Sequence, residues 1–513
     1  MKKIISVLMC LTILVLTVSS IGSGVSAYSS TVGTDIPTIY VGGQGETIYD
    51  KDGNKIYPFD ISMDIIKEEL EPIINSYSKG LFFNDWDSFL DKVYEICLKF
   101  LGPVALDENG DVSDGSYARF SWKKEELDGQ KVNGYYPLDR YYFEYDWRVD
   151  PFDIARELHS YIEDVLEVTG ETKVEMIGRC LGASVAEAYM YLYDGEYIDS
   201  YLQYASGSQG VMIMSNSFAG TLGLYPDSID RFIVDNGKLN LEGATFDLVS
   251  SIVTILNKTN ILDAVCLMFN KTYQNIYMDI IPRLVGETFA TMPGYWSMVE
   301  DEYYEKAKEV SLYSRGYTED SRLVRRIDDY HYNVQQKIGD IFEKMKTEKG
   351  ITISNITKYG KVSYFFFEES KYLNDETARI SCTSYGATTS TVTGILSPFY
   401  LLKKTIENDT KYISPDLKID ASTCLNPDTT YFIKNLTHTD FPKSVEPYIV
   451  RILNNNDCTV DTYDDFPQYS VYINKKIEPM TKENMFTDKA YYTSLTKSVI
   501  TLFSTLFELA KNN

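Results

Sequence analysis

The chain has 513 residues, of which 44% are hydrophobic and 14% aromatic, and its formal net charge is −25 at pH 7. So negative a surface repels nucleic acid and anionic membranes, and we exclude both as partners. The length suits one large domain with insertions, or two domains.

The first 27 residues have the pattern of a secretory signal peptide. Lys2 and Lys3 precede the apolar run 4–18, and Val25-Ser26-Ala27 provides small residues at the usual cleavage positions. We therefore expect cleavage after Ala27 and a secreted, extracellular protein; a retained membrane anchor is the alternative. No later run approaches the roughly 20 apolar residues of a transmembrane helix.

Six cysteines follow the signal sequence. Their wide, irregular spacing is unlike a disulfide scaffold or a zinc site, so we expect mostly buried, reduced thiols and leave one disulfide open. The sequence has no P-loop, no dinucleotide fingerprint and no H-E-x-x-H, so it implies no cofactor and no metal. The six residues are Cys97, Cys180, Cys266, Cys382, Cys424 and Cys458.

Residues 28–214 alternate between strand-like and helical patterns. Short β-branched and aromatic runs predict strands, and apolar residues at helical spacing predict the helices between them. This order is typical of a mostly parallel sheet with helices on both faces, so the predicted fold class is α/β. The expected strands are 38–41, 141–145, 174–177 and 200–204, and the expected helices are 152–168 and 181–193.

Two stretches interrupt the alternation. Residues about 60–130 contain two helical patterns, 63–77 and 86–101, and residues 215–355 are largely helical by periodicity. The second stretch follows the strand after the expected turn at residue 180, where a cap or lid is inserted in such folds. We expect 28–214 and 356–513 to form one core, and 215–355 its helical cap.

Strand character resumes at 362–367 and at 429–434. The tail 491–510 predicts an amphipathic helix that packs on the body of the protein. The loop Asp107–Asp111 faintly resembles a calcium-binding loop, but Val112 and Ala118 replace its glycine and its glutamate. We expect a solvated turn there.

The most informative motif is Gly178-Arg179-Cys180-Leu181-Gly182, which follows the apolar run 174–177. It has the form of the strand–turn–helix nucleophile elbow G-x-S-x-G, with cysteine in place of serine. Side chains two residues before and after the nucleophile would collide in so sharp a turn, which explains the glycines. Cys180 is therefore the candidate nucleophile, at the positive end of a helix.

A thiol nucleophile needs a base, and histidine is the usual one. The chain has three: His159 in the helix before the elbow strand, His331 in the expected cap, and His438 after the last clear strand. The order nucleophile–acid–histidine of α/β-hydrolases favours His438.

The acid that orients the base should precede it on the loop after the previous strand. Asp416 and Asp420 both fit this position. The spacing of Asp416 to a following aliphatic residue favours it, and Asp420 remains the alternative. Two backbone N–H groups should form the oxyanion hole, one from Leu181 and one from Gln44 in the loop Gly42-Gly43-Gln44.

The chain resembles secreted α/β-hydrolases of the lipase class, and most closely the lecithin:cholesterol acyltransferase and lysosomal phospholipase A2-like group. The resemblance lies in Tyr145-Asp146-Trp147-Arg148, in Thr169-Gly170-Glu171-Thr172-Lys173-Val174 and in the elbow. It covers roughly residues 36–46, 140–215 and 360–445. Arg179-Cys180 replaces the usual His-Ser, and Gly182-Ala183 replaces Gly-Gly.

This resemblance implies an ester hydrolase or acyltransferase that acts on an acyl-ester or lipid-like substrate. With a Cys180–His438–Asp416 triad the acyl-enzyme would be a thioester, which water, an alcohol or an amine could resolve. Cysteine at an elbow also occurs in dienelactone-hydrolase-like enzymes. The alternatives are a catalytically inactive binding protein on the same scaffold, or an amidase, thioesterase or peptidase. The sequence does not specify the substrate or the oligomeric state.

Overall fold

The structure is a computed structural model that describes residues 32–45, 47–58, 72, 75–76, 87–118, 122–234, 243–361, 366–392 and 394–485. The predicted signal peptide, most of the predicted helix 63–77 and the predicted tail helix 491–510 lie outside these residues. The chain forms two compact units. Unit 1 comprises Met1–Gly220 and Ile276–Ile353, and unit 2 comprises Thr221–Asn275 and Ser354–Asn513.

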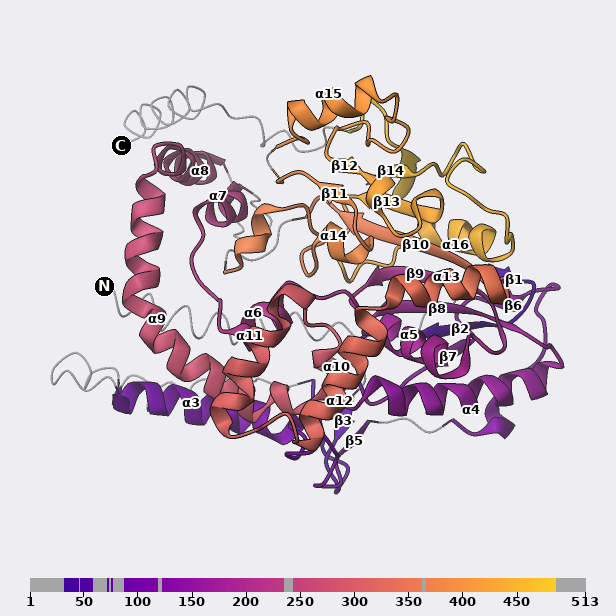
Figure 1. Ribbon diagram of the computed structural model, residues 1–513, viewed down its shortest axis with the longest axis horizontal. Coiled ribbons are helices and arrows are strands. Elements are labelled where there is room, and N and C mark those ends of the chain that lie inside the picture. The colour runs from indigo at the N-terminus through magenta and orange to yellow at the C-terminus, as the bar shows by residue number, and fades with distance from the viewer. Residues whose placement is uncertain are drawn as a thin grey trace. The chain divides into compact units, whose positions relative to one another are not determined.

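Unit 1 contains four parallel strands in the order β9-β8-β2-β7. Helix α4 packs on α5, and α5 packs in turn on β8 and β9 (Figure 1). The strands are β2 (Thr38–Val41), β7 (Tyr141–Phe143), β8 (Val174–Cys180) and β9 (Ile198–Ser206), with the shorter β1 (Gly33–Thr34), β3 (Ile48–Tyr49), β4 (Lys55–Tyr57), β5 (Tyr117–Ala118) and β6 (Tyr136–Pro137) outside this sheet. The helices are α3 (Asp87–Leu101), α4 (Pro151–Thr169), α5 (Leu181–Tyr193), α6 (Met212–Ala219), α10 (Pro293–Trp296), α11 (Asp301–Ser311), α12 (Arg322–Tyr330) and α13 (Ile338–Lys349).

Unit 2 has its own run of strands. β10, β13 and β14 are parallel neighbours, and β15 returns antiparallel to β14 as a hairpin. The strands are β10 (Thr352–Tyr359), β11 (Thr388–Thr389), β12 (Ile419–Asp420), β13 (Thr430–Lys434), β14 (Tyr469–Ile473) and β15 (Lys476–Pro479). The helices are α7 (Pro226–Val234), α8 (Gly243–Lys258), α14 (Ile380–Thr383), α15 (Pro398–Ile406) and α16 (Glu446–Leu453), and α9 (Ile261–Glu287) begins in unit 2 and ends in unit 1.

The chain is therefore mixed α/β with mostly parallel strand pairing, as the sequence predicts. The predicted strand and helices on either side of Cys180 are confirmed. In this region the hydrophobic periodicity and the residues that begin and end helices indicate the same elements. Asp150 accepts the Phe152 N–H to cap the start of α4, and Gly170, at φ 73°, ends that helix as expected. One predicted strand, 362–367, lies mostly outside the described residues. Its last two residues, Phe366 and Phe367, are not in a strand, and β10, which precedes it, was not predicted. No single helix among the described residues is long and apolar enough to cross a membrane.

Strand β8 buries a carboxyl group at its start. Glu175 is the second residue of the strand, between Val174 and Met176, and accepts a hydrogen bond of 2.8 Å from the hydroxyl of Thr38. Burial raises its pKa to about 8, the Thr38 hydrogen bond acts against that rise, and Asp199 and Asp35 add to it. The folded protein therefore holds a proton on Glu175 at neutral pH.

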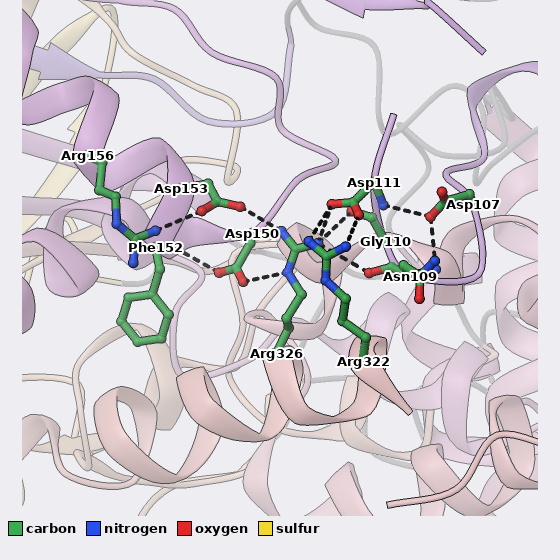
Figure 2. A network of polar contacts seen from close by, with 10 residues as sticks. All are labelled: Asp107, Asn109, Gly110, Asp111, Asp150, Phe152, Asp153, Arg156, Arg322 and Arg326. Carbon is green, nitrogen blue, oxygen red and sulfur yellow. Dashed lines mark hydrogen bonds and ion pairs between the residues drawn. The ribbon is translucent and has the colours of Figure 1, made fainter. Parts of the chain in front are cut away.

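A cluster of polar contacts centres on Arg326 of α12 (Figure 2). The loop 107–111 closes as a turn in which Asp107 Oδ1 accepts the N–H groups of Asn109 and Asp111 at 2.8 and 3.0 Å. The expected turn is confirmed, but it is only partly exposed, because a guanidinium group occupies some of its acceptors. Arg326 contacts Asp111 Oδ1 at 2.8 Å, Asp150 Oδ2 at 3.0 Å, Asp153 Oδ2 at 2.6 Å and the carbonyl oxygens of Asn109 and Gly110 at 3.2 Å.

We predict that Glu175→Gln changes the pH dependence of stability. In the wild type the folded carboxyl group ionises near pH 8 and the unfolded one near 4.5, so the folded state binds the extra proton. The free energy of unfolding should fall as the pH rises through this window, by an amount on the order of 4 kcal/mol. Urea unfolding at pH values from about 4 to about 9, which bracket the two pKa values, measures this change. The variant should show a flatter profile, and the exposed Glu319→Gln should match the wild type.

We also predict that Arg326→Gln destabilises unit 1 by about 2–4 kcal/mol, because it leaves the buried carboxylate of Asp150 without its cation. The matched control is Arg322→Gln. Arg322 also contacts Asp111 from α12, but its side chain is mostly exposed, and the loss should be small. Chemical denaturation of the two variants provides the comparison, and equal losses would contradict the role assigned to Arg326.

Candidate functional site

Cys180 ends β8 and immediately precedes the first residue of α5. Its backbone has φ 51° and ψ −122°, in a region that residues other than glycine rarely occupy. Such a conformation costs on the order of 1–3 kcal/mol and persists only where the surroundings enforce it. The side chain is partly exposed, whereas the other five described cysteines are buried. A strained, accessible thiol therefore stands at a strand-to-helix turn.

The neighbouring glycines are required by close packing around this turn. A Cβ on Gly182 would lie 2.2 Å from the carbonyl oxygen of Val41 and 2.3 Å from that of Gly42. A Cβ on Gly178 would lie 3.0 Å from Ala183 Cα, and one on Gly43 would lie 2.9 Å from Cys180 Cβ. The collisions expected from the motif are thus present, and the Gly42-Gly43 loop lies directly against the cysteine.

The glycine loop after β2 is held by aromatic residues. The hydroxyl of Tyr145 donates to the carbonyl oxygen of Gly42 at 2.8 Å. The Gln44 side-chain amide donates to the hydroxyl groups of Tyr57, at 3.4 Å, and Tyr295. Trp147 stacks on Tyr295, with ring centroids 5.3 Å apart. Gln44 and Leu181, the predicted oxyanion-hole residues, thus lie on segments that meet at Cys180, and the oxyanion hole itself stays a prediction.

Arg179 supplies a buried positive charge beside the thiol. Its guanidinium lies 3.4 Å from the hydroxyl of Tyr40. Burial acts to lower the pKa of Arg179, but interactions with Tyr40, Tyr204 and Cys180 outweigh it and raise that pKa. The group therefore remains charged. A cation that interacts with Cys180 stabilises a thiolate relative to a thiol.

The backbone behind Cys180 is fixed by hydrogen bonds within unit 1. The Gly207 N–H donates to the carbonyl oxygen of Cys180 at 3.1 Å. The next residue, Ser208, donates from its hydroxyl to the fully buried Glu187 at 2.9 Å, and its carbonyl oxygen accepts the side-chain amide of Gln335 at 2.7 Å. These contacts restrict movement of the turn that follows β9.

His438 lies in unit 2, after β13, and is paired with Asp375. Its Nδ1 lies 2.7 Å from Asp375 Oδ2, and its backbone N–H donates to the Asp375 carbonyl oxygen, also at 2.7 Å. Burial acts to raise the pKa of Asp375, but His438, Lys358 and the N–H of Ala378 outweigh it, and the pKa is lowered. The pair is thus an ionised carboxylate that orients an imidazole, the arrangement of base and acid in a catalytic triad.

The structure places the two predicted acids, Asp416 and Asp420, next to other side chains. Asp416 accepts hydrogen bonds from Ser414 at 2.7 Å and from Lys434 at 3.3 Å. Asp420 is bonded to Tyr400 at 2.7 Å and to Lys404 at 3.1 Å. Both carboxylates are therefore committed to hydroxyl and lysine partners, and Asp375 takes the position next to His438.

Asp375 was missed because the strand before it was misplaced. β10 reads T-I-S-N-I-T-K-Y, and its polar side chains hide the strand pattern although most are buried. The apolar run Phe365-Phe366-Phe367 gave the stronger signal. With β10 as the strand before β13, Asp375 lies on the loop that the hydrolase order assigns to the acid. Once β10 is recognised as a strand, the position of Asp375 between β10 and β13 identifies it as a candidate acid.

The other two histidines have structural partners. His159 on α4 stacks on Tyr193, with ring centroids 4.0 Å apart. His331 is buried and stacks on Tyr304 at 3.5 Å, and burial lowers its pKa. Within the described residues, no group of three or more His, Cys, Asp or Glu side chains could hold a metal ion, and the six cysteines form no disulfide.

No family model matches the chain, and no curated protein matches it closely enough to count as a relative.

We predict that Gly182→Ala disrupts the elbow. The added methyl group meets two carbonyl oxygens of the β2 end, which cannot move without shifting the strand. The expected cost is more than about 3 kcal/mol in unfolding free energy, or a rearranged turn in which Cys180 reacts differently with iodoacetamide. The control is Gly102→Ala, whose added Cβ would make only an ordinary contact, 3.5 Å from Leu98 Cδ1, at a glycine that, like Gly182, has no positive φ.

Proposed function

We propose that the protein is an exported carboxylic-ester hydrolase or acyltransferase of the α/β-hydrolase class. In this proposal Cys180 is the nucleophile, His438 is the general base and Asp375 orients the base. The observation that carries it is the backbone of Cys180. Cys180 has φ 51° and ψ −122° and lies between a buried strand and a helix. The adjoining glycines have no room for side chains. This is the geometry of a nucleophile elbow.

Three further features support the proposal. The helix N-terminus and the charged Arg179 favour a thiolate on Cys180. The His438–Asp375 pair follows the nucleophile in the chain order of the α/β-hydrolases, although the acid is not the one first expected. The Y-D-W-R segment and the elbow resemble the lecithin:cholesterol acyltransferase and phospholipase A2-like group, which favours an acyl ester as substrate.

The proposed reaction has two halves. The Cys180 thiolate attacks the ester carbonyl carbon and forms an S–C bond, and the resulting oxyanion accepts hydrogen bonds from the N–H groups of Gln44 and Leu181. The C–O bond to the alcohol then breaks, and His438 gives the leaving oxygen the proton that it took from the Cys180 thiol. Water next attacks the thioester while His438 takes its proton, which releases the acid and restores the thiolate. An alcohol in place of water gives acyl transfer.

We predict that turnover of p-nitrophenyl butyrate depends on all three residues. Cys180→Ala should abolish turnover and remove the site that iodoacetamide labels. His438→Gln should lower kcat by about 10³-fold or more, and Asp375→Asn by up to about 10⁴-fold, because the imidazole loses its orientation. Combining Cys180→Ala with His438→Gln should add little, since the residues act as a unit.

The matched control is Asp416→Asn, which removes the originally expected acid. It should retain most of the activity while its melting temperature reports any loss of the Lys434 pair. If Asp416→Asn and Asp375→Asn are equally impaired at equal stability, the assigned acid is wrong. Wild-type protein with neither turnover nor selective labelling of Cys180 would instead indicate a binding protein on this scaffold.

A further inference from the structure

Lys358, the second-last residue of β10, is a fully buried lysine. Its ammonium group donates to the carbonyl oxygen of His438 at 2.5 Å and to the carbonyl oxygen of Asp440 at 2.8 Å. A buried charge is unfavourable unless hydrogen-bond partners and an opposite charge compensate it. These two acceptors are neutral, so a carboxylate close by has to balance the charge itself.

The carboxylate that interacts with this charge belongs to Asp375. Burial acts to raise the pKa of Asp375, but His438, Lys358 and the N–H of Ala378 outweigh it and lower that pKa. Asp375 is fully buried, and its Oδ2 lies 2.7 Å from Nδ1 of His438. One carboxylate thus balances the lysine and orients the imidazole at the same time.

The turn 437–440 is held by hydrogen bonds on both sides of the histidine. The Thr437 N–H donates to the Asp440 carboxylate at 2.6 Å, and the Asp440 N–H donates to the Thr437 carbonyl oxygen at 3.2 Å. The His438 N–H donates to the Asp375 carbonyl oxygen at 2.7 Å, and the His438 carbonyl oxygen accepts from Lys358. Lys358 therefore joins β10 to this turn at two carbonyl oxygens.

The other ionisable groups near this pair differ from Lys358 in exposure or in direction. Lys434 of β13 is one residue out of register with Lys358, so the two side chains point to opposite faces of the strands. The Lys434 ammonium contacts Asp416 at 3.3 Å instead. The remaining groups are only partly buried, and water and salt screen their charges. They are Lys361, Glu376, Arg379 and Asp440.

A buried cation beside this pair changes how readily the imidazole takes up a second proton. A carboxylate that is hydrogen-bonded to a histidine favours the charged imidazolium, and a positive charge close to both groups opposes it. A general base has to be neutral before it can accept a proton. A histidine next to both charges therefore stays available as a base at a lower pH than a histidine next to the carboxylate alone.

We infer that Lys358 is a positioning residue for the proposed base. It fixes the turn that carries His438, and its buried charge, set against that of Asp375, keeps the imidazole neutral in mildly acidic surroundings. Lys358 acts through these two residues and touches no reacting atom. The inference rests on the proposed function, because only a base needs its neutral form, but the electrostatic effect on His438 exists without any turnover.

The test is an NMR titration of isotope-labelled histidine in the full chain with Cys180→Ala, which removes the thiol that the proposed function assigns to His438. The chain has three histidines, so the signal that His438→Gln removes identifies this one. Lys358→Met removes the charge and the donor, whereas Lys358→Gln removes the charge and keeps a donor for the carbonyl oxygens. In both variants the pKa of His438 should rise by about one unit or more.

Two controls separate charge from packing. Lys358→Arg keeps the charge and should leave the His438 titration unchanged. Lys434→Met removes another buried lysine of unit 2 together with its ion pair to Asp416. It should lose stability in urea unfolding but titrate at His438 as the parent does. An unchanged titration in both Lys358→Met and Lys358→Gln, or an equal rise in Lys434→Met, would overturn the inference.

Ester turnover provides the second readout, in the chain that retains Cys180. Lys358→Gln should move the acid limb of kcat/KM for p-nitrophenyl butyrate to higher pH, whereas a structural loss alone lowers the profile at every pH. The same pH profile in this variant and the wild type would overturn the inference and leave the proposed function intact. A raised pKa of His438 without wild-type turnover would contradict the proposed function and support the electrostatic role of Lys358.

Discussion

The backbone of Cys180 has a positive φ, which is strained for any residue other than glycine. Contacts within unit 1 supply the free energy that keeps it in this conformation. The β2 end can approach the elbow because Gly43 and Gly182 have no Cβ. Tyr145 and Gln44 then hold the β2 loop in place through hydrogen bonds. Loss of any of these contacts allows the turn to relax. The aromatic residues of this region therefore help to fix the position of the Cys180 sulfur.

Several carboxyl groups are buried in the two units, and each has a hydrogen-bond or ion-pair partner. Glu175 keeps its proton and accepts from Thr38, Glu187 accepts from Ser208, and Asp375 is ionised against His438. The three carboxyl groups thus meet burial in different ways, by protonation, by hydrogen bonding and by pairing with a base. The third combines an oriented imidazole with an ionised acid, which suits proton transfer rather than packing alone.

The sequence predicted the central elements of unit 1 well, because local signals agree with the fold there. Strand 38–41, helix 181–193 and the Gly170 stop have unambiguous periodicity and end residues. The failures have physical causes. β10 buries Asn355, Thr357 and Lys358, so its pattern does not look like that of a strand. Asp375 could be found only from the neighbouring strand.

The contact between Arg326 and the loop 107–111 has a consequence for the response of the protein to calcium. The loop provides carboxylate and carbonyl oxygens of the kind that bind a calcium ion, yet its cation is a side chain of the same polypeptide. A tethered cation has a high effective concentration at its site that neither dilution nor a chelator can reduce. The joint between α12 and the start of α4 is therefore independent of the calcium content of the medium that surrounds the protein.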